Sequence, residues 1–332
     1  MPRVLITPTT LKHIHHDGPH MALLRKAGIE IVTPPEPWDH QLVEEEVIQL
    51  LHGIDATIAG MEPYTERVFA AHPQLKVVAR VGVGYDAVDV AAATRHGVAV
   101  TITPGTNHET VAELTFALLL ALTKQITTDD RQMRQGIWHR HVTIPVRGST
   151  LGIVGLGRIG KAIAVRAQAF GMKVQAFEVQ PDQEFVKQQG IRLVDLPTLL
   201  QTSDVVSLHA PATPETKHLI NRQTLAMMKP TAFLINTARG GLIDEPALVE
   251  ALKNGKLAGA GLDVFAEEPP AKDHPFYQLD NIVMTPHTGG TDTKSRIDMA
   301  ELAAKAVVEL LAGRWPEELV VNKDVRVSYA RK

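Results

Sequence analysis

Short apolar runs alternate with amphipathic stretches from the first residues of the chain onward. Over the first hundred residues the apolar runs have the length of strands, and the segments between them have helical spacing. Strands that are apolar throughout and alternate with helices predict a parallel sheet covered on both faces. The predicted strands are 3–7, 29–32, 55–60, 75–82 and 98–103, and the predicted helices are 20–28, 40–53, 65–72 and 87–97.

The same alternation starts again near residue 149. Helices such as 158–171 and 245–256 connect the new strands, and two long helical stretches, 108–126 and 292–313, lie before and after them. Because 292–313 follows the last of these strands, we expect it to return to the first unit. The second set of predicted strands is 149–155, 173–178, 191–195, 204–210, 231–236, 257–264 and 281–286.

These patterns predict an α/β protein with two doubly wound parallel-sheet domains, the second inserted into the first. We expect residues 1–104 and 293–332 to form the substrate domain, and 105–292 to form the cofactor domain. The cleft between two such domains is a common place for a small-molecule site.

Composition removes several classes of function. The 332 residues carry a net charge of -3 without a basic cluster, which argues against a nucleic-acid partner. The chain has no cysteine, so disulfides, thiolate chemistry and cysteine-ligated zinc are excluded. The N-terminus lacks a signal-peptide pattern, and the most apolar segment, 114–122, is too short to span a membrane. We therefore expect a cytoplasmic protein that does not contact membranes.

The segment LGIVGLGRIG, residues 151–160, has the pattern of a dinucleotide cradle. Gly155 permits a tight turn, Gly157 lets the backbone approach a pyrophosphate, and Gly160 allows close packing of helix on strand. The following helix presents its N-terminus to phosphate. Glu178 ends the next predicted strand, where its carboxylate can accept the ribose hydroxyls and would repel a 2′-phosphate. No Arg or Lys lies in 177–185, so NAD is expected as the cofactor rather than NADP.

Further polar motifs stand at the ends of later predicted strands, where open α/β sheets bind ligands. Together with the glycine loop they closely resemble the D-isomer-specific 2-hydroxyacid dehydrogenases, from about residue 50 to about residue 315. The resemblance implies a Rossmann cofactor domain inserted into a flavodoxin-like substrate domain, and an NAD-dependent oxidoreductase acting on a D-2-hydroxy acid. The motifs are RVGVGYDAVD (80–89), TPGTNHETVAE (103–113), SDVVSLHAPATPETKHLI (203–220), NTARGG (236–241), LDVFAEEPP (262–270) and TPHTGG (285–290).

The resemblance implies catalytic roles for three residues. Arg239 would hold the substrate carboxylate and polarise the carbonyl, His287 would be the acid/base, and Glu268 would pair with His287. The chemistry agrees with these roles, because histidine exchanges protons near neutral pH and the arginine fork binds a carboxylate through two hydrogen bonds.

The resemblance also implies a set of binding residues. The substrate carboxylate would contact Arg239 and the amides of Val83 and Gly84, with Arg80 nearby. His209 is interpreted as structural or cofactor-adjacent rather than catalytic. No metal is expected, and the stretch HIHHDG (13–18) is interpreted as plain surface. The implied cofactor contacts are Gly155, Gly157, Arg158, Ile159, Gly160, Glu178, His209, Pro211, Thr216, Thr237, Ala238, Asp263 and Thr110.

Residues that differ from those of related branches of the family narrow the range of possible substrates. Glu268 stands where the formate-oxidising branch has glutamine, and Val83 where the phosphite-oxidising branch has lysine, so a hydroxy acid is favoured. In the phosphoglycerate dehydrogenases, arginines at places like Arg80 and Arg140 help to bind a phosphate. Against that group, an arginine usual after the third strand is replaced by Gly60 and Met61, and the chain ends without the C-terminal regulatory domain that many of them carry.

The sequence leaves both the substrate and the class of function open. 3-Phosphoglycerate is the first candidate substrate, followed by glyoxylate or hydroxypyruvate and by a bulkier D-2-hydroxy acid. An NAD-sensing corepressor on the same fold is the alternative from another class. An L-specific dehydrogenase is disfavoured, since those enzymes open with their dinucleotide cradle. The polar segment 127–148 is expected to embrace a second subunit, which gives a homodimer.

Overall fold

The computed structural model describes residues 1–14, 18–37 and 39–326, which divide into two compact units. Unit 1 consists of Met1–Asn107 and Gly290–Lys332, and unit 2 of His108–Gly289. Residues 15–17 of the histidine-rich stretch 13–18, which was interpreted as plain surface, lie outside the described residues.

Unit 1 is built on a five-stranded parallel sheet with the order β2-β1-β3-β4-β5. This is the flavodoxin-like order, in which the chain reverses its direction of travel between β1 and β3. The strands are β1 (Arg3–Ile6), β2 (Glu30–Val32), β3 (Ala56–Ala59), β4 (Val77–Arg80) and β5 (Ala99–Thr101), and the helices are α1 (Pro19–Lys26), α2 (Glu44–Leu50), α3 (Glu66–Ala71), α4 (Val90–Arg95) and α12 (Thr293–Leu311).

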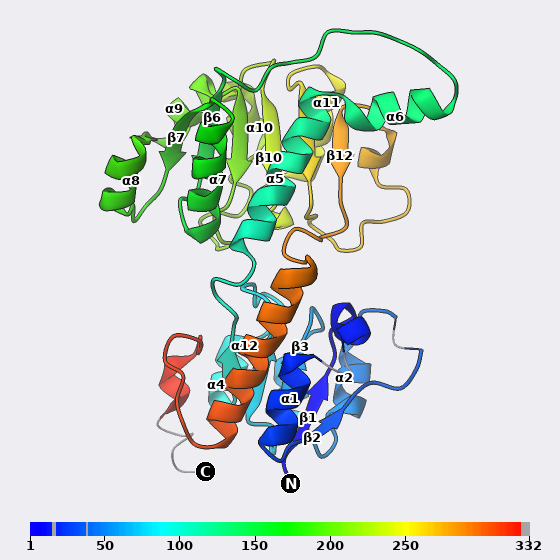
Figure 1. The fold of residues 1–332 in the computed structure, drawn as a ribbon, viewed down its shortest axis with the longest axis vertical. Helices are drawn as coiled ribbons and strands as arrows, with labels where there is room; N and C mark the ends of the chain where they lie inside the picture. The colour runs from blue at the N-terminus through cyan, green and yellow to red at the C-terminus, as the bar shows by residue number, and fades with distance from the viewer. Residues whose placement is uncertain (15–17, 38, 327–332) are drawn as a thin grey trace. The chain divides into compact units, whose positions relative to one another are not determined.

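Alternating side chains of the unit 1 strands build two cores. On β1, Val4 and Ile6 pack with α1 and α12, whereas Leu5 packs with α2 to α4 on the other face. Figure 1 shows α12 running beside α1, which it contacts closely. The prediction that the last long helix returns to the first unit is confirmed.

Unit 2 is built on a seven-stranded parallel sheet with the order β12-β11-β10-β9-β6-β7-β8. Its switch point lies between β6 and β9, as in a Rossmann fold extended by one strand. The predicted fold class is thereby confirmed for both units. The strands are β6 (Thr150–Val154), β7 (Lys173–Phe177), β8 (Arg192–Leu193), β9 (Val205–Leu208), β10 (Phe233–Asn236), β11 (Gly259–Leu262) and β12 (Ile282–Met284). The helices are α5 (His108–Thr123), α6 (Ile126–Arg134), α7 (Arg158–Ala169), α8 (Gln183–Gln189), α9 (Leu196–Thr202), α10 (Arg222–Met227) and α11 (Glu245–Lys253).

The long helix predicted for 108–126 is shorter than expected. It ends at Thr123 because Gln125 adopts a left-handed conformation, and α6 starts in a new direction with no buried residue. Figure 1 shows α5 beside α7, and α5 also packs on β10, β11 and β12. No single helix in the described ranges is long and apolar enough to cross a membrane; α5 and α6 pass that test only as a pair, which is bent by 61°.

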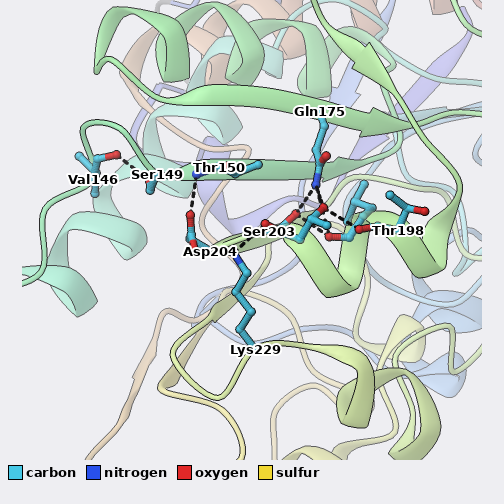
Figure 2. A network of polar contacts seen from close by, with 10 residues as sticks. Val146, Ser149, Thr150, Gln175, Thr198, Ser203, Asp204 and Lys229 are labelled. Atoms are coloured by element: carbon cyan, nitrogen blue, oxygen red, sulfur yellow. Dashed lines mark hydrogen bonds and ion pairs between the residues drawn. The ribbon is translucent and has the colours of Figure 1, made fainter.

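Polar side chains form a hydrogen-bonded network near the amino ends of strands in unit 2 (Figure 2). The carboxylate of Asp204 accepts from the amide of Thr150 and from Nζ of Lys229, both at 2.8 Å. Burial raises the pKa of Asp204, but the Lys229 ammonium and the Thr150 amide outweigh it and hold this pKa below its usual value. The Gln175 amide donates to Ser203 and Thr202 beside them. This network lies away from the carboxyl ends, so it supports the fold and leaves the opposite edge for chemistry.

Candidate active site

The glycine loop joins β6 to α7 at the carboxyl edge of the unit 2 sheet. Gly155 has φ +94°, and a Cβ there would lie 2.7 Å from the main chain of His209. A Cβ on Gly160 would collide with the carbonyl of Gly155. At Gly157, by contrast, a Cβ would meet no atom within 4 Å, and this residue caps α7 without a side-chain hydrogen bond. Two glycines therefore close the turn, and the third leaves an open approach to a helix N-terminus.

Glu178 directly follows β7 and folds back onto this loop. One carboxylate oxygen accepts from the amide of Leu156 at 2.7 Å, and the other from the amide of Gln180 at 3.0 Å. A fixed carboxylate beside the glycine turn is suited to accept the hydroxyls of an adenosine ribose. Loop and carboxylate together fit NAD by an observation independent of the motif: the space beside Gly157, at the N-terminus of α7, is open.

Arg239 lies in the turn after β10, between the strand and the short 3₁₀ segment Gly240–Leu242. The Asn236 amide donates to the carbonyl of Arg239 at 2.9 Å, and Nη1 of Arg239 donates to the carbonyl of Ala238 at 2.7 Å. A Cβ on Gly240 would collide with the main chain of Phe265, so this turn rests directly on the segment that follows β11. The guanidinium is half-buried at the strand end.

His287 and Glu268 meet in a short contact. Nδ1 of His287 lies 2.6 Å from Oε2 of Glu268, and Oε1 of Glu268 accepts from the amide of Phe265 at 3.0 Å. Burial raises the pKa of Glu268, but the hydrogen bond and charge of His287, the Phe265 amide and the Arg239 charge outweigh it and hold this pKa below its usual range. Nδ1 is thereby occupied, which leaves Nε2 of His287 for a reacting oxygen.

The backbone of His287 is held in an unusual conformation by Asp263. His287 has φ +52°, a region that residues other than glycine rarely adopt. The buried carboxylate of Asp263 accepts from Thr285 Oγ1 and from the amides of Thr288 and Gly289, at 2.6 to 2.9 Å. Its carbonyl accepts from the amide of His287 at 2.8 Å. The structure thus places Asp263, predicted as a cofactor contact, under the loop that carries the histidine.

His209 is partly buried beside the glycine turn. Its Nε2 lies 2.7 Å from Oγ of Ser207, and its Nδ1 has no partner among the residues that the structure describes. Burial lowers the pKa of His209 to about 3, so the ring is uncharged at neutral pH. This agrees with the interpretation of His209 as structural or cofactor-adjacent.

The other predicted cofactor residues lie around the same edge of unit 2. Thr237 is buried, and its hydroxyl contacts that of Thr115 on α5 at 2.9 Å. The amide of Ala238 donates to Asn236, and Thr216 donates to the carbonyl of Pro211 at 2.7 Å. Arg158 and Ile159 open α7, and Thr110 lies in the first turn of α5.

The predicted substrate residues of unit 1 lie at the carboxyl end of β4. Arg80 is only 3% exposed; its nitrogens donate to the carbonyls of Gly84 and Ala59 and to the sulfur of Met61. Its guanidinium is thus committed to the protein's own groups. The amides of Val83 and Gly84 donate no hydrogen bond within the described part of the chain.

Glu62, which the sequence analysis did not single out, is buried next to this strand end. It is 3% exposed and accepts from the Gly60 amide at 3.0 Å, from Tyr64 Oη at 3.2 Å and from Thr7. Burial and the Glu62 charge raise the pKa of Tyr64 well above its usual value, while the charge of Arg80 acts in the opposite sense. The sequence feature that could have identified Glu62 is its place two residues after Gly60, at the end of β3.

Comparisons with known proteins agree with this architecture. Residues 116–289 match the family model described as D-isomer specific 2-hydroxyacid dehydrogenase, NAD binding domain. A glyoxylate reductase of Korarchaeum cryptofilum is 42% identical over 85% of this chain and 87% of its own length. A D-3-phosphoglycerate dehydrogenase of Methanocaldococcus jannaschii is 37% identical over 96% of this chain and 59% of its own length. The structure of a D-lactate dehydrogenase of Aquifex aeolicus with NAD and lactic acid, 29% identical, aligns with a TM-score of 0.84 over 96% of this chain and 99% of that one.

Proposed function

The chain belongs to the D-isomer-specific 2-hydroxyacid dehydrogenase family, and we propose that it reduces a small, unphosphorylated 2-keto acid with NADH, and reverses that reaction, using Arg239, Glu268 and His287. The observation that carries the proposal is the 2.6 Å contact between His287 and a Glu268 carboxylate that also feels the charge of Arg239. An acid/base, a partner that holds it, and a cation for the substrate carboxylate are thus within one strand-end region of unit 2.

NADH, held by the glycine loop and Glu178, would supply the hydride that C2 of the keto acid accepts. Arg239 binds the substrate carboxylate and draws electron density toward the carbonyl oxygen. As the C=O electron pair moves onto that oxygen, Nε2 of His287 donates a proton to it, which gives the hydroxyl. In the oxidation direction Nε2 takes the proton back. Glu268 keeps the ring oriented through Nδ1.

We propose that the amides of Val83 and Gly84 also take part in binding the substrate carboxylate. Their freedom from other acceptors in the described residues supports this role. Arg80 then acts indirectly: its Nε donates to the Gly84 carbonyl at 3.1 Å and thereby fixes the segment that carries both amides. The residues around the glycine loop, with Thr237, Ala238, Asp263 and Thr110, are proposed to contact NAD.

The substrate tail is expected to lack a phosphate. Arg80 is already bonded to the protein, and the buried Glu62 beside it would repel a second anion. A panel of glyoxylate, hydroxypyruvate and 3-phosphohydroxypyruvate with NADH tests this in one absorbance assay. We expect kcat/KM for hydroxypyruvate to exceed that for its phosphorylated form by at least about 100-fold, on the scale of a buried like-charge penalty of several kcal/mol.

Other results of the substrate panel would support a different function. Preference for the phosphorylated acid would overturn the substrate class and restore 3-phosphoglycerate, the first candidate from the sequence. A protein that binds NADH but turns over none of the acids would favour the corepressor-like alternative.

Glu178 is expected to set the choice between NADH and NADPH. Wild type should use NADH with a kcat/KM on the order of 100-fold higher, since its carboxylate would repel the 2′-phosphate of NADPH. Glu178→Gln keeps an acceptor for the ribose and removes the charge, so the ratio should fall by about tenfold or more. Glu184→Gln, an exposed residue in α8, is the matched control and should leave the ratio unchanged. Equal use of both cofactors by the wild type would reject the assignment.

We further propose that the protein is a cytoplasmic homodimer formed through the segment 127–148. The support is a set of exposed apolar side chains in or next to this segment, namely Ile126, Met133, Ile137, Trp138, Val142 and Ile144. Exposed apolar patches of this kind commonly mark protein–protein contacts. Arg140 lies exposed in the same segment.

A further inference from the structure

Glu245 is a carboxylate that the catalytic scheme does not use, although it lies close to the Glu268 segment. It is the first residue of α11, and its side chain is only 12% exposed. The N-cap of that helix is Asp244, whose side chain accepts from the amide of Ala247. Glu245 is therefore not needed to cap its own helix, and its carboxylate turns to other donors.

Two donors converge on this carboxylate from the segment after β11. Oε1 accepts from the amide of Ala266 at 2.8 Å, and Oε2 lies 3.3 Å from Nε2 of His274. The amide of Phe276 donates to Nδ1 of His274 at 3.3 Å, so Nδ1 is the acceptor of that ring and Nε2 carries the hydrogen. Nε2 of His274 thus donates to Glu245. Its ring packs on the buried Phe276, with 4.7 Å between centroids.

The amide that Glu245 holds is next to the amide that holds Glu268. Phe265 donates to Oε1 of Glu268 at 3.0 Å, and the other oxygen of Glu268 contacts His287. Two successive amides, those of Phe265 and Ala266, are thus fixed by two different carboxylates. The same turn rests on Gly240, the neighbour of Arg239, where no Cβ could fit. A shift of this turn would displace Glu268 from His287.

We propose that Glu245, held by His274, is a positioning residue for the His287–Glu268 pair. The inference rests on the proposed function of that pair and adds two residues to its support. A carboxylate is required at position 245, since both converging groups are N–H donors and a glutamine would present its own NH₂ to one of them. Loss of either partner leaves the Ala266 turn free to move, and a displacement of about 1 Å can reduce a rate by about 100-fold.

The test compares Glu245→Gln, His274→Gln and the double variant with wild type. We expect kcat for keto acid reduction to fall by about 10- to 100-fold in each single variant. The NADH dissociation constant, from protein fluorescence, should change by less than about twofold. The double variant should be no worse than the more impaired single one, because both residues act through one turn. Glu250→Gln, on the same helix and paired with Arg222 on the surface, is the matched control and should keep wild-type kcat.

A second readout needs no turnover. ¹H–¹⁵N spectra of histidine-labelled protein follow the His287 ring through a pH titration, with its signal identified by its loss in His287→Gln. In Glu245→Gln its midpoint should move in the same direction as in Glu268→Gln. Lower thermal stability with unchanged kcat and an unchanged His287 midpoint would show a structural role only and overturn the inference. Wild type that reduces no keto acid would instead reject the proposed function, while the titration still decides the role of Glu245.

Discussion

Arg239→Ala is expected to lower kcat/KM for 2-keto acid reduction by roughly 100- to 10,000-fold. A hydrogen bond to a charged group contributes about 1.5–3 kcal/mol, and the arginine fork can make two of them to a carboxylate. At about 1.4 kcal/mol per tenfold, their loss accounts for this range. Arg239→Lys keeps the charge and loses the planar fork, so it should retain an intermediate activity.

The local fold should survive the change. The turn is held through the Arg239 carbonyl, which accepts from Asn236, and this bond does not depend on the side chain. NADH binding, followed by fluorescence, should therefore stay close to wild type. Arg222→Ala removes an exposed arginine that pairs with Glu250 and serves as the control for a lost surface charge. If Arg239→Ala retained keto acid turnover within about threefold of wild type, another cation would have to bind the substrate.

Much of the fold is encoded in local patterns of the sequence. Apolar runs such as 3–7 and 149–155 contain the strands Arg3–Ile6 and Thr150–Val154, because strands buried on both faces admit few polar residues. The glycine motif predicted a tight turn, and at Gly160 that tightness is local, because a Cβ there would collide with the carbonyl of Gly155. The end of α5 was not predicted, because the residue with the left-handed backbone is Gln125 and not a glycine, which would have indicated a helix end in the sequence.

In the candidate site, too, the sequence indicated some features and not others. Motif order indicated Arg239, Glu268 and His287, but not the contacts that support them. Glu245 and Ala266 are 21 positions apart, and their hydrogen bond depends on where α11 begins relative to the turn after β11. Likewise, the burial of Arg80 follows from the packing of β3 against β4 in unit 1. Such contacts depend on tertiary packing, which residue types and local spacing do not specify.

The His287–Glu268 pair should reveal itself in the pH dependence of both reaction directions. Reduction needs a protonated His287 and oxidation a neutral one, so reduction should fail and oxidation should rise as pH increases. The pKa of Glu268 is held below its usual range, so this carboxylate is charged throughout any assay between about pH 6 and pH 10. The falling limb of the pH profile for reduction and the rising limb for oxidation therefore cannot be titrations of Glu268 itself. His287→Gln removes the proton donor and should lower kcat by about 100- to 10,000-fold.

Glu268→Gln keeps the shape of the side chain and removes its charge. The imidazolium of His287 then loses a carboxylate partner at 2.6 Å, so its proton should leave at a lower pH. Both limbs are expected to move together: reduction should fail earlier on the pH scale, and oxidation should begin earlier. Profiles of kcat/KM in each direction measure this, since that ratio reports ionisations of the free enzyme. Glu267→Gln alters an exposed carboxylate in the same turn and should leave both limbs in place. Limbs of Glu268→Gln that stay fixed, or that move to higher pH, would mean that another charge controls the protonation of His287.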